Sequence, residues 1–217
     1  MRNKITIVFD FDGTIADSLT LVTKIVTQLS SKYRLKNDQL ELSDFQNLPA
    51  KEIIKLLGLK WWNLPLFIFE VKQKMNKDLN EVKLFDQIEE TVQTLNNIDV
   101  ELNIMSSNSK KNINSFLKQK NLSHYFSKIY TSSKLFNKDK SILKIKNAYP
   151  NSTLIYVGDE IRDIEACQKI NIPVIAVSWG YNSYQALKKS TPNYLVKKPS
   201  EIVDIVKNHI DYNPKVN

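Results

Sequence analysis

The sequence predicts an α/β protein, built as a doubly wound parallel sheet with a helical insertion after its first strand. Five short apolar runs, most of them rich in valine and isoleucine, alternate with segments of helical spacing. This alternation is typical of a parallel sheet covered by helices on both faces. Between the first run and the second, a long interval holds helical spacing and no convincing strand.

The five apolar runs are the expected strands. Each is bounded by polar or turn-forming residues, as the buried strands of parallel sheets are. The strands are expected at residues 5–11, 100–107, 129–132, 153–159 and 174–179. Segments with helical spacing lie between them, at residues 88–95, 113–117, 142–148 and 161–170.

The insertion is expected to consist of helices. Residues 17–33 have amphipathic spacing, and residues 50–57 and 64–75 predict two further helices. Gly58 and Pro65 mark turns within this region. The tail of the chain, residues 211–217, is expected to fray.

Composition favours a soluble protein of the cytoplasm. With 42% apolar residues the chain can bury a core, and its single cysteine, Cys167, allows no internal disulfide, which fits a reducing compartment. No apolar stretch approaches the ~20 residues that span a bilayer, so we expect no membrane partner. The apolar run that follows Lys4 is too short for a signal peptide.

The chain is basic, with 31 lysine and arginine residues against 23 acidic residues and a formal charge of +8. Such a charge attracts anions, from nucleic acid to phosphorylated small molecules. The lysines are scattered along the chain rather than massed in one tract. We therefore expect a small phosphorylated partner and no nucleic acid. Nucleic-acid binding stays open as an alternative that rests on charge alone.

Two aspartates end the first strand. Residues two apart in a strand point to the same side, so Asp10 and Asp12 lie together at the carboxyl end of the sheet, where open α/β sheets bind ligands. Neighbouring carboxylates repel each other unless a cation relieves them, and oxygen ligands suit Mg²⁺. Gly13 lets the backbone turn sharply and leaves room for a ligand. The alternative is a solvated turn with two unrelated aspartates.

Acidic residues also end the fourth strand. Asp159 and Asp163 are four residues apart, so a helix that begins near Glu160 would turn both towards one site. Carboxylates also favour a helix N-terminus, and capping could explain one of these acids. Capping does not explain why two strands present acids at one edge of the sheet. We therefore expect these acids to share a divalent cation with those of the first strand.

Hydroxyl groups and a lysine complete the candidate site. Ser106, Ser107 and Asn108 end the second strand just before a helix, where hydroxyls and backbone amides bind anions, although serine and asparagine also cap helices. Lys138 and Lys140 begin the helix that precedes the fourth strand. Either lysine could face the acidic cluster or be solvated at the surface.

Together these residues predict the transfer of a phosphoryl group from a phosphate ester. Asp10 would attack phosphorus and form an aspartyl-phosphate. Asp12 would protonate the leaving oxygen and then activate water. A Mg²⁺ ion and Lys138 would offset the charge of the transferring group. We expect Ser106 to take part in this chemistry.

The same motifs resemble the haloacid dehalogenase-like phosphohydrolase superfamily. The matching parts are residues 9–18, Ser106, Lys138 and residues 158–166, in the order that the family has, and the resemblance covers nearly the whole chain. Residues 176–183 are similar to the branch labelled phosphoglycolate phosphatases.

The resemblance implies a domain organisation. A Rossmann-like core would comprise residues 1–15 and 84–217, and a small helical cap, residues 16–83, would close over the substrate. Within the core, Gly13, Thr14, Ser107 and Asn108 are expected to bind the substrate, a small phosphate monoester such as phosphoglycolate.

The resemblance also implies a ligand set for Mg²⁺. The ion would be held by Asp10, the backbone carbonyl of Asp12, and Asp159, with Asp163 as a further ligand or as the support of one. Ser106 would bind the phosphate. Lys138 would bridge Asp10 and the phosphate.

Two other activities stay open at this point. A sugar phosphomutase of the same superfamily would use the same chemistry of Asp10. A signalling receiver or interaction domain also phosphorylates an aspartate at a strand end, but lacks the second aspartate and the helical insertion. Trp61 and Trp62 are interpreted as cap core or a docking surface rather than a substrate platform, and Arg162 could reach a substrate or face solvent.

Overall fold

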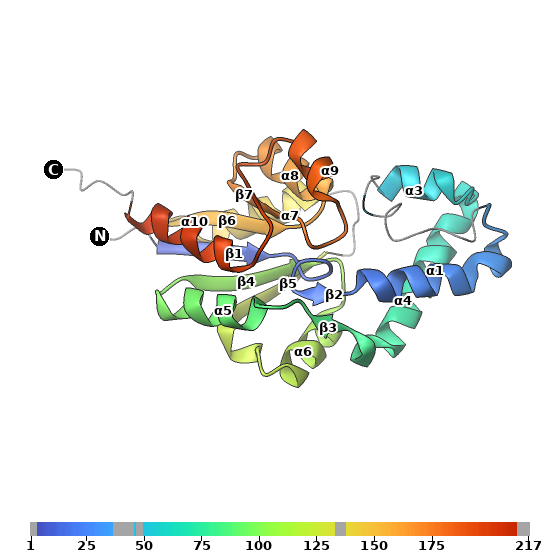
Figure 1. Ribbon diagram of the computed structural model, residues 1–217, viewed down its shortest axis with the longest axis horizontal. Coiled ribbons are helices and arrows are strands. Elements are labelled where there is room, and N and C mark those ends of the chain that lie inside the picture. Colours follow the sequence, from blue (N-terminus) through green and yellow to red (C-terminus); the bar gives the residue numbers. More distant parts are fainter. Residues whose placement is uncertain (1–3, 37–45, 47–49, 133–137, 212–217) are drawn as a thin grey trace.

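Figure 1 shows a computed structural model of the chain, with a central sheet between two layers of helices and a separate group of helices beyond one end of the sheet. The structure describes residues 4–36, 46, 50–132 and 138–211. The expected fraying of the tail falls on residues 212–217, which lie outside the described part, whereas Asp211 still belongs to a helix. Within the described ranges, no helix is both long and apolar enough to cross a membrane.

The described residues form one parallel sheet of six strands, in the order β5-β4-β1-β6-β7-β8. Its strands are β1 (Lys4–Phe9), β4 (Glu101–Ser106), β5 (Phe126–Thr131), β6 (Ser152–Gly158), β7 (Val174–Val177) and β8 (Tyr194–Val196). The chain moves outwards from β1 to β5, crosses back to β6, and then moves outwards in the opposite direction. The expected doubly wound sheet is thus confirmed. Because the direction reverses between β1 and β6, the carboxyl ends of these two neighbours form the usual ligand site of such a sheet.

Helices cover both faces of the sheet. One face carries α5 (Ile88–Asn97), α6 (Lys110–Gln119) and α10 (Ser200–Asp211), and the other carries α7 (Lys138–Ala148), α8 (Ile161–Lys169) and α9 (Tyr184–Lys189). Successive side chains of β1 alternate between the two layers: Ile7 and Phe9 pack with the first set of helices, and Val8 packs with the second. This burial on both faces explains why the strands are continuous apolar runs.

The interval after β1 is helical, as the sequence predicts. It contains α1 (Leu19–Tyr33), α3 (Ala50–Leu56) and α4 (Leu64–Lys77), which lie beyond the carboxyl ends of the strands (Figure 1). Helix α4 packs on α1 through the buried Phe67, whose ring meets Tyr33 edge-on with the centroids 5.1 Å apart.

A short two-stranded ladder stands where the chain leaves and re-enters the sheet region. β2 (Ala16–Asp17) pairs antiparallel with β3 (Lys83–Leu84). The outgoing and returning segments of the insertion therefore lie side by side. The ladder follows closely on Asp12, whose backbone forms a bridge with Ala16.

Candidate active site

Asp10 is the first residue beyond β1, and its side chain is buried. Oδ1 accepts a hydrogen bond from the backbone N–H of Phe11 at 2.7 Å, and Oδ2 lies 2.5 Å from Nζ of Lys138. Burial raises the pKa of Asp10 to about 7, although the charge of Lys138 works in the opposite direction. The carboxylate therefore carries a charge that its surroundings only partly offset.

Asp159 follows β6, the strand beside β1, and is completely buried. Its Oδ1 accepts a hydrogen bond of 2.7 Å from the hydroxyl of Thr14, and its Oδ2 accepts one of the same length from the backbone N–H of Tyr181. Burial, followed by the charges of Glu160 and Asp10, raises its pKa well above the ordinary value. Both oxygens are oriented, but only by uncharged donors.

Lys138 contacts acidic residues that follow two different strands, β1 and β6. Its ammonium group contacts the carboxylates of both Asp10 and Asp163, and its side chain is only 11% exposed. Lys140, two residues further along α7, is exposed. The structure therefore brings Lys138, and not Lys140, to the carboxyl end of β1.

Asp163 lies in the first turn of α8, where its carboxylate accepts a hydrogen bond from the backbone N–H of Glu160 at 3.2 Å. The pair forms a capping box, so the capping interpretation is correct for one oxygen of Asp163. The other oxygen faces Lys138. Asp163 thus stabilises the helix start and belongs to the acidic cluster at the same time.

The acidic cluster fits a divalent metal ion. One carboxylate oxygen from each of Asp10, Asp159 and Asp163 can be chosen so that all three lie within 4.8 Å of one another. When all three are ionised, these carboxylates carry three negative charges, and Lys138 supplies one positive charge in contact with two of them, which leaves two. A hard divalent cation with oxygen ligands would offset these two charges.

The carboxylate of Asp12 is not a member of this cluster and lies beside the residues that end β4. Its Oδ2 lies 3.4 Å from the hydroxyl of Ser106 and 3.4 Å from the side-chain nitrogen of Asn108. Burial raises the pKa of Asp12, while hydrogen bonds from Ser18, Asn108 and Ser106 oppose the rise. A raised pKa favours the protonated form, which can donate a proton.

The residues that end β4 are arranged around Asp12. Ser106 is 2% exposed, and its hydroxyl accepts the backbone N–H of Asn108 at 2.9 Å. Ser107 is half-buried, and its backbone carbonyl lies 3.5 Å from Nζ of Lys72 on α4. The structure therefore brings the expected Ser106 and Asn108 beside Asp12, and adds a lysine from the insertion.

Gly13 and Thr14 pack against the side chain of Asp159. Gly13 has a φ of +81°, and a Cβ placed on it would lie 2.1 Å from Oδ2 of Asp159. Thr14 is fully buried and its hydroxyl is used by Asp159. The sequence predicts substrate contacts for these two residues. The structure instead gives the Thr14 side chain a supporting position, because it has no surface open to a ligand.

The loop after β7 supports the site in a way that the sequence analysis did not predict, since residues 176–183 were noted there only for their similarity to the phosphoglycolate phosphatase branch. Besides the Tyr181 N–H, the indole N–H of Trp179 donates to the backbone carbonyl of Thr14 at 3.1 Å, and Oδ1 of Asn182 accepts the backbone N–H of Ile161 at 2.9 Å. A Cβ on Gly180 would lie 2.2 Å from the carbonyl oxygen of Gly13. One available signal was Gly180 itself, since the chain has only four glycines.

Three residues of uncertain role are also placed. Arg162 donates to Glu160 at 2.5 Å beside the acidic cluster, so neither of the two roles considered for it describes it fully. Trp61 and Trp62 are 78% and 59% exposed at the turn before α4, so they do not belong to the core of the insertion. Their rings touch each other edge-on.

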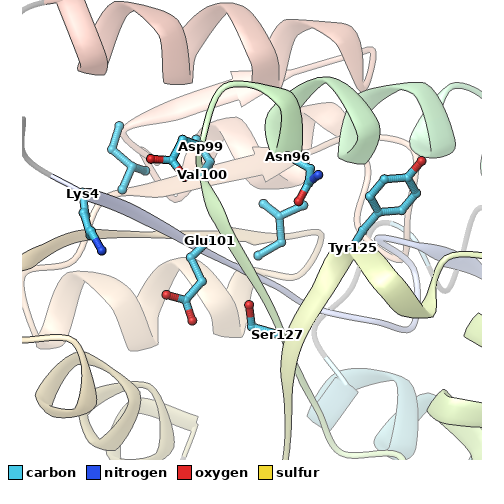
Figure 2. A pocket seen from close by; sticks show the side chains of 9 residues that line it. Lys4, Asn96, Asp99, Val100, Glu101, Tyr125 and Ser127 are labelled. Atoms are coloured by element: carbon cyan, nitrogen blue, oxygen red, sulfur yellow. The ribbon is translucent and has the colours of Figure 1, made fainter.

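A cavity of about 360 Å³ lies at the opposite end of the sheet, far from the aspartates along the strands. Figure 2 shows its lining, which comes from the first residues of β1 and β4, the end of α5 and the segment around Tyr125. Lys4, Asp99 and Glu101 give it mixed charge. None of the predicted site residues lines it.

The metal-free protein is expected to lose stability as the pH rises from 3.8 to about 7. Over this interval folded Asp10 keeps a proton that the unfolded chain has released, and stability falls with pH wherever the folded state binds more protons. Melting temperatures measured in chelator across the interval test this. Asp10→Asn, which lacks the titrating group, should show a smaller fall, and a wild type that falls no more than this variant would contradict the expectation.

The fold and the paired acidic strand ends define the class of the protein. Residues 7–177 match the family model of the haloacid dehalogenase-like hydrolases, and the chain belongs to this family. The resemblance drawn from the motifs is thereby confirmed, as is the expectation of an enzyme.

Individual relatives agree with this assignment. A phosphoglycolate phosphatase of Synechococcus elongatus is 28% identical over 92% of this chain and 96% of its own length. The pyrophosphatase PpaX of Oceanobacillus iheyensis is 26% identical, over 93% of this chain and 96% of its own. The crystal structure of a predicted phosphatase from Clostridium acetobutylicum covers 94% of this chain and 99% of its own, with a TM-score of 0.78 and 24% identity. The similarity to the phosphoglycolate phosphatase branch is confirmed.

Proposed function

We propose that the protein is a Mg²⁺-dependent phosphatase that hydrolyses a small phosphate monoester through an aspartyl-phosphate on Asp10. The observation that carries this proposal is the position of the Asp10 carboxylate. It belongs to the acidic cluster and contacts Lys138, while Asp12, two residues further along the chain, has its carboxylate beside Ser106. A nucleophile, a cation site and a proton donor thus meet at one strand end.

In the first half-reaction, a carboxylate oxygen of Asp10 bonds to phosphorus as the ester P–O bond breaks. The proton of Asp12 passes to the leaving oxygen. In the second, Asp12 takes a proton from water, which attacks the aspartyl-phosphate and frees Asp10. Ser106 and the backbone amides after it would bind phosphate oxygens, and Lys138 would balance their charge.

Asp10, Asp159 and the backbone carbonyl of Asp12 would hold Mg²⁺, with Asp163 as a ligand or as the support of one. The ion would offset negative charge on the transferring phosphoryl group. The charge count of the cluster supports a divalent ion, and the all-oxygen donor set suits Mg²⁺. Thr14, Gly13 and the loop after β7 would fix Asp159, so that the site is formed before the ion binds.

The insertion, residues 16–83, would act as a cap on a core of residues 1–15 and 84–217. The ladder of β2 and β3 supports this division, because it lies at both proposed boundaries. The core and insertion meet again where Gln46 donates to the carbonyl of Gly180 at 3.1 Å. We also propose that the enzyme acts in the cytoplasm, where the buried free thiol of Cys167 would stay reduced.

The expected substrate is phosphoglycolate or a similar small ester, which the phosphoglycolate phosphatase relative suggests. Pyrophosphate is a second candidate, because the PpaX relative covers 93% of this chain, against 92% for the phosphoglycolate phosphatase. A phosphomutase would use the same Asp10 chemistry and return the phosphate to a sugar.

Hydrolysis of phosphoglycolate, pyrophosphate, sugar phosphates and nucleotides should be measured with Mg²⁺ and again with excess chelator. We expect release of inorganic phosphate from at least one monoester, and loss of that release in chelator. An isomeric sugar phosphate as product would identify a mutase. A long-lived aspartyl-phosphate without turnover would identify a receiver, and no reaction of any kind would contradict the proposal.

A further inference from the structure

Helix α4 of the insertion contacts the loop after β4 through two side chains one helical turn apart. Nζ of Lys72 lies 3.5 Å from the carbonyl oxygen of Ser107. Four residues later, the side-chain oxygen of Asn76 accepts a hydrogen bond from the side-chain nitrogen of Asn112, near the start of α6. This face of α4 therefore rests on the segment that surrounds Asp12.

The contact continues inwards through a second amide. The same nitrogen of Asn112 donates to Oδ1 of Asn108 at 2.9 Å, and the side-chain nitrogen of Asn108 lies 3.4 Å from Oδ2 of Asp12. An amide side chain accepts at its oxygen and donates at its nitrogen, so fixing one end directs the other. Asn76, Asn112 and Asn108 thus form a continuous chain from the insertion to the carboxylate.

The side chain of Asn112 is not needed to begin helix α6. The N-cap of this helix is Ser109, whose hydroxyl accepts the backbone N–H of Asn112 at 3.2 Å. The two N–H groups of the Asn112 side chain remain for Asn76 and Asn108. The separation of 3.4 Å between Asn108 and Asp12 is long for a hydrogen bond, so a small shift of Asn108 decides whether that bond forms.

We propose that Asn112 is a positioning residue, which links the seating of α4 to the orientation of the Asp12 carboxyl group through Asn108. The proposal rests on the proposed function, in which Asp12 is the proton donor. When the Asp10–phosphorus bond forms and the ester bond breaks, the proton of Asp12 must reach the ester oxygen. A carboxyl group turned away from that oxygen delivers the proton poorly.

Two esters separate this role from a general structural one. The leaving group of an alkyl phosphate is a strongly basic alkoxide, so its departure needs the proton of Asp12. The leaving group of p-nitrophenyl phosphate is a stable phenolate, and its departure depends little on that proton. The ratio kcat/KM covers binding and the steps up to the first irreversible one, here formation of the aspartyl-phosphate. We expect Asn112→Ala to lower kcat/KM for the alkyl phosphate about tenfold and to leave that for the aryl phosphate nearly unchanged.

Matched variants complete the test, all measured with Mg²⁺ on the full chain. Asn112→Asp keeps the shape of the side chain but loses both N–H donors, so it should show the same selective loss. Asn76→Ala should show part of it, and the double variant with Asn112→Ala should add little, because the two residues act in one chain. Asn114→Ala, at an exposed asparagine of the same helix, should change neither ester.

An equal loss for both esters, or no loss for either, would overturn the positioning role while the proposed function stands. If the wild type hydrolyses neither ester, the proposed function itself fails. A melting temperature for each variant shows whether it is folded, and Asn112→Asp provides the measurement if Asn112→Ala is not.

Discussion

Asp10→Asn is expected to abolish turnover while leaving the fold intact. The amide keeps the size of the side chain and can still accept the N–H of Phe11, but it cannot attack phosphorus, and it loses the charge that faces Lys138. Removal of a covalent nucleophile costs on the order of 10⁴-fold or more in kcat. Steady-state release of phosphate from the best monoester substrate gives the measurement.

The control for this variant is Asp86→Asn, at an exposed aspartate just before α5. It should keep the turnover of the wild type. The melting temperature of Asp10→Asn at neutral pH should equal or exceed that of the metal-free wild type. The change removes a buried carboxyl group whose raised pKa shows that its charge is poorly compensated. Turnover like that of the wild type in a folded Asp10→Asn protein would reject the aspartyl-phosphate mechanism.

The second large effect is expected for Asp159→Asn. This change removes one of the negative charges that the cluster offers to a cation. The size of the side chain stays the same, so it still lies beside the Thr14 hydroxyl and the Tyr181 N–H. We expect the affinity for Mg²⁺ to fall by about 100-fold, and kcat/KM at limiting Mg²⁺ to fall with it. Calorimetric titration of Mg²⁺ into the protein measures the affinity without any substrate.

High concentrations of Mg²⁺ should restore part of the activity of Asp159→Asn, and none of that of Asp10→Asn. This difference separates a metal ligand from a nucleophile. If Asp159→Asn binds Mg²⁺ as tightly as the wild type, the ion does not use this carboxylate, and the proposed metal site is wrong.

The sequence predicts the acidic residues of the site because their positions follow from the ends of strands. Asp10 and Asp159 each come directly after an apolar run, and parallel strands end at one edge of the sheet. The choice between Lys138 and Lys140 was not predictable in the same way. Two residues further along a helix point in a different direction, and only the packing of α7 shows which lysine faces the aspartates.

The remaining parts depend on contacts between distant segments. Strand β8 has three residues and α9 has six, so neither carries enough periodicity to stand out in a sequence. The support of Asp159 by the Tyr181 amide uses a backbone group, which leaves no trace in residue type. The approach of Asn76 to Asn112 joins two helices whose relative placement the sequence pattern does not give.

The ladder of β2 and β3 makes the insertion an excursion that starts and ends at one spot. Because the ends of the insertion are held together, a longer or differently folded insertion would destabilise the sheet little. The entropic cost of closing such a loop grows only slowly with its length. Evolution can therefore replace the whole insertion, and with it the surface that covers the site, while the carboxyl ends of the strands keep their spacing.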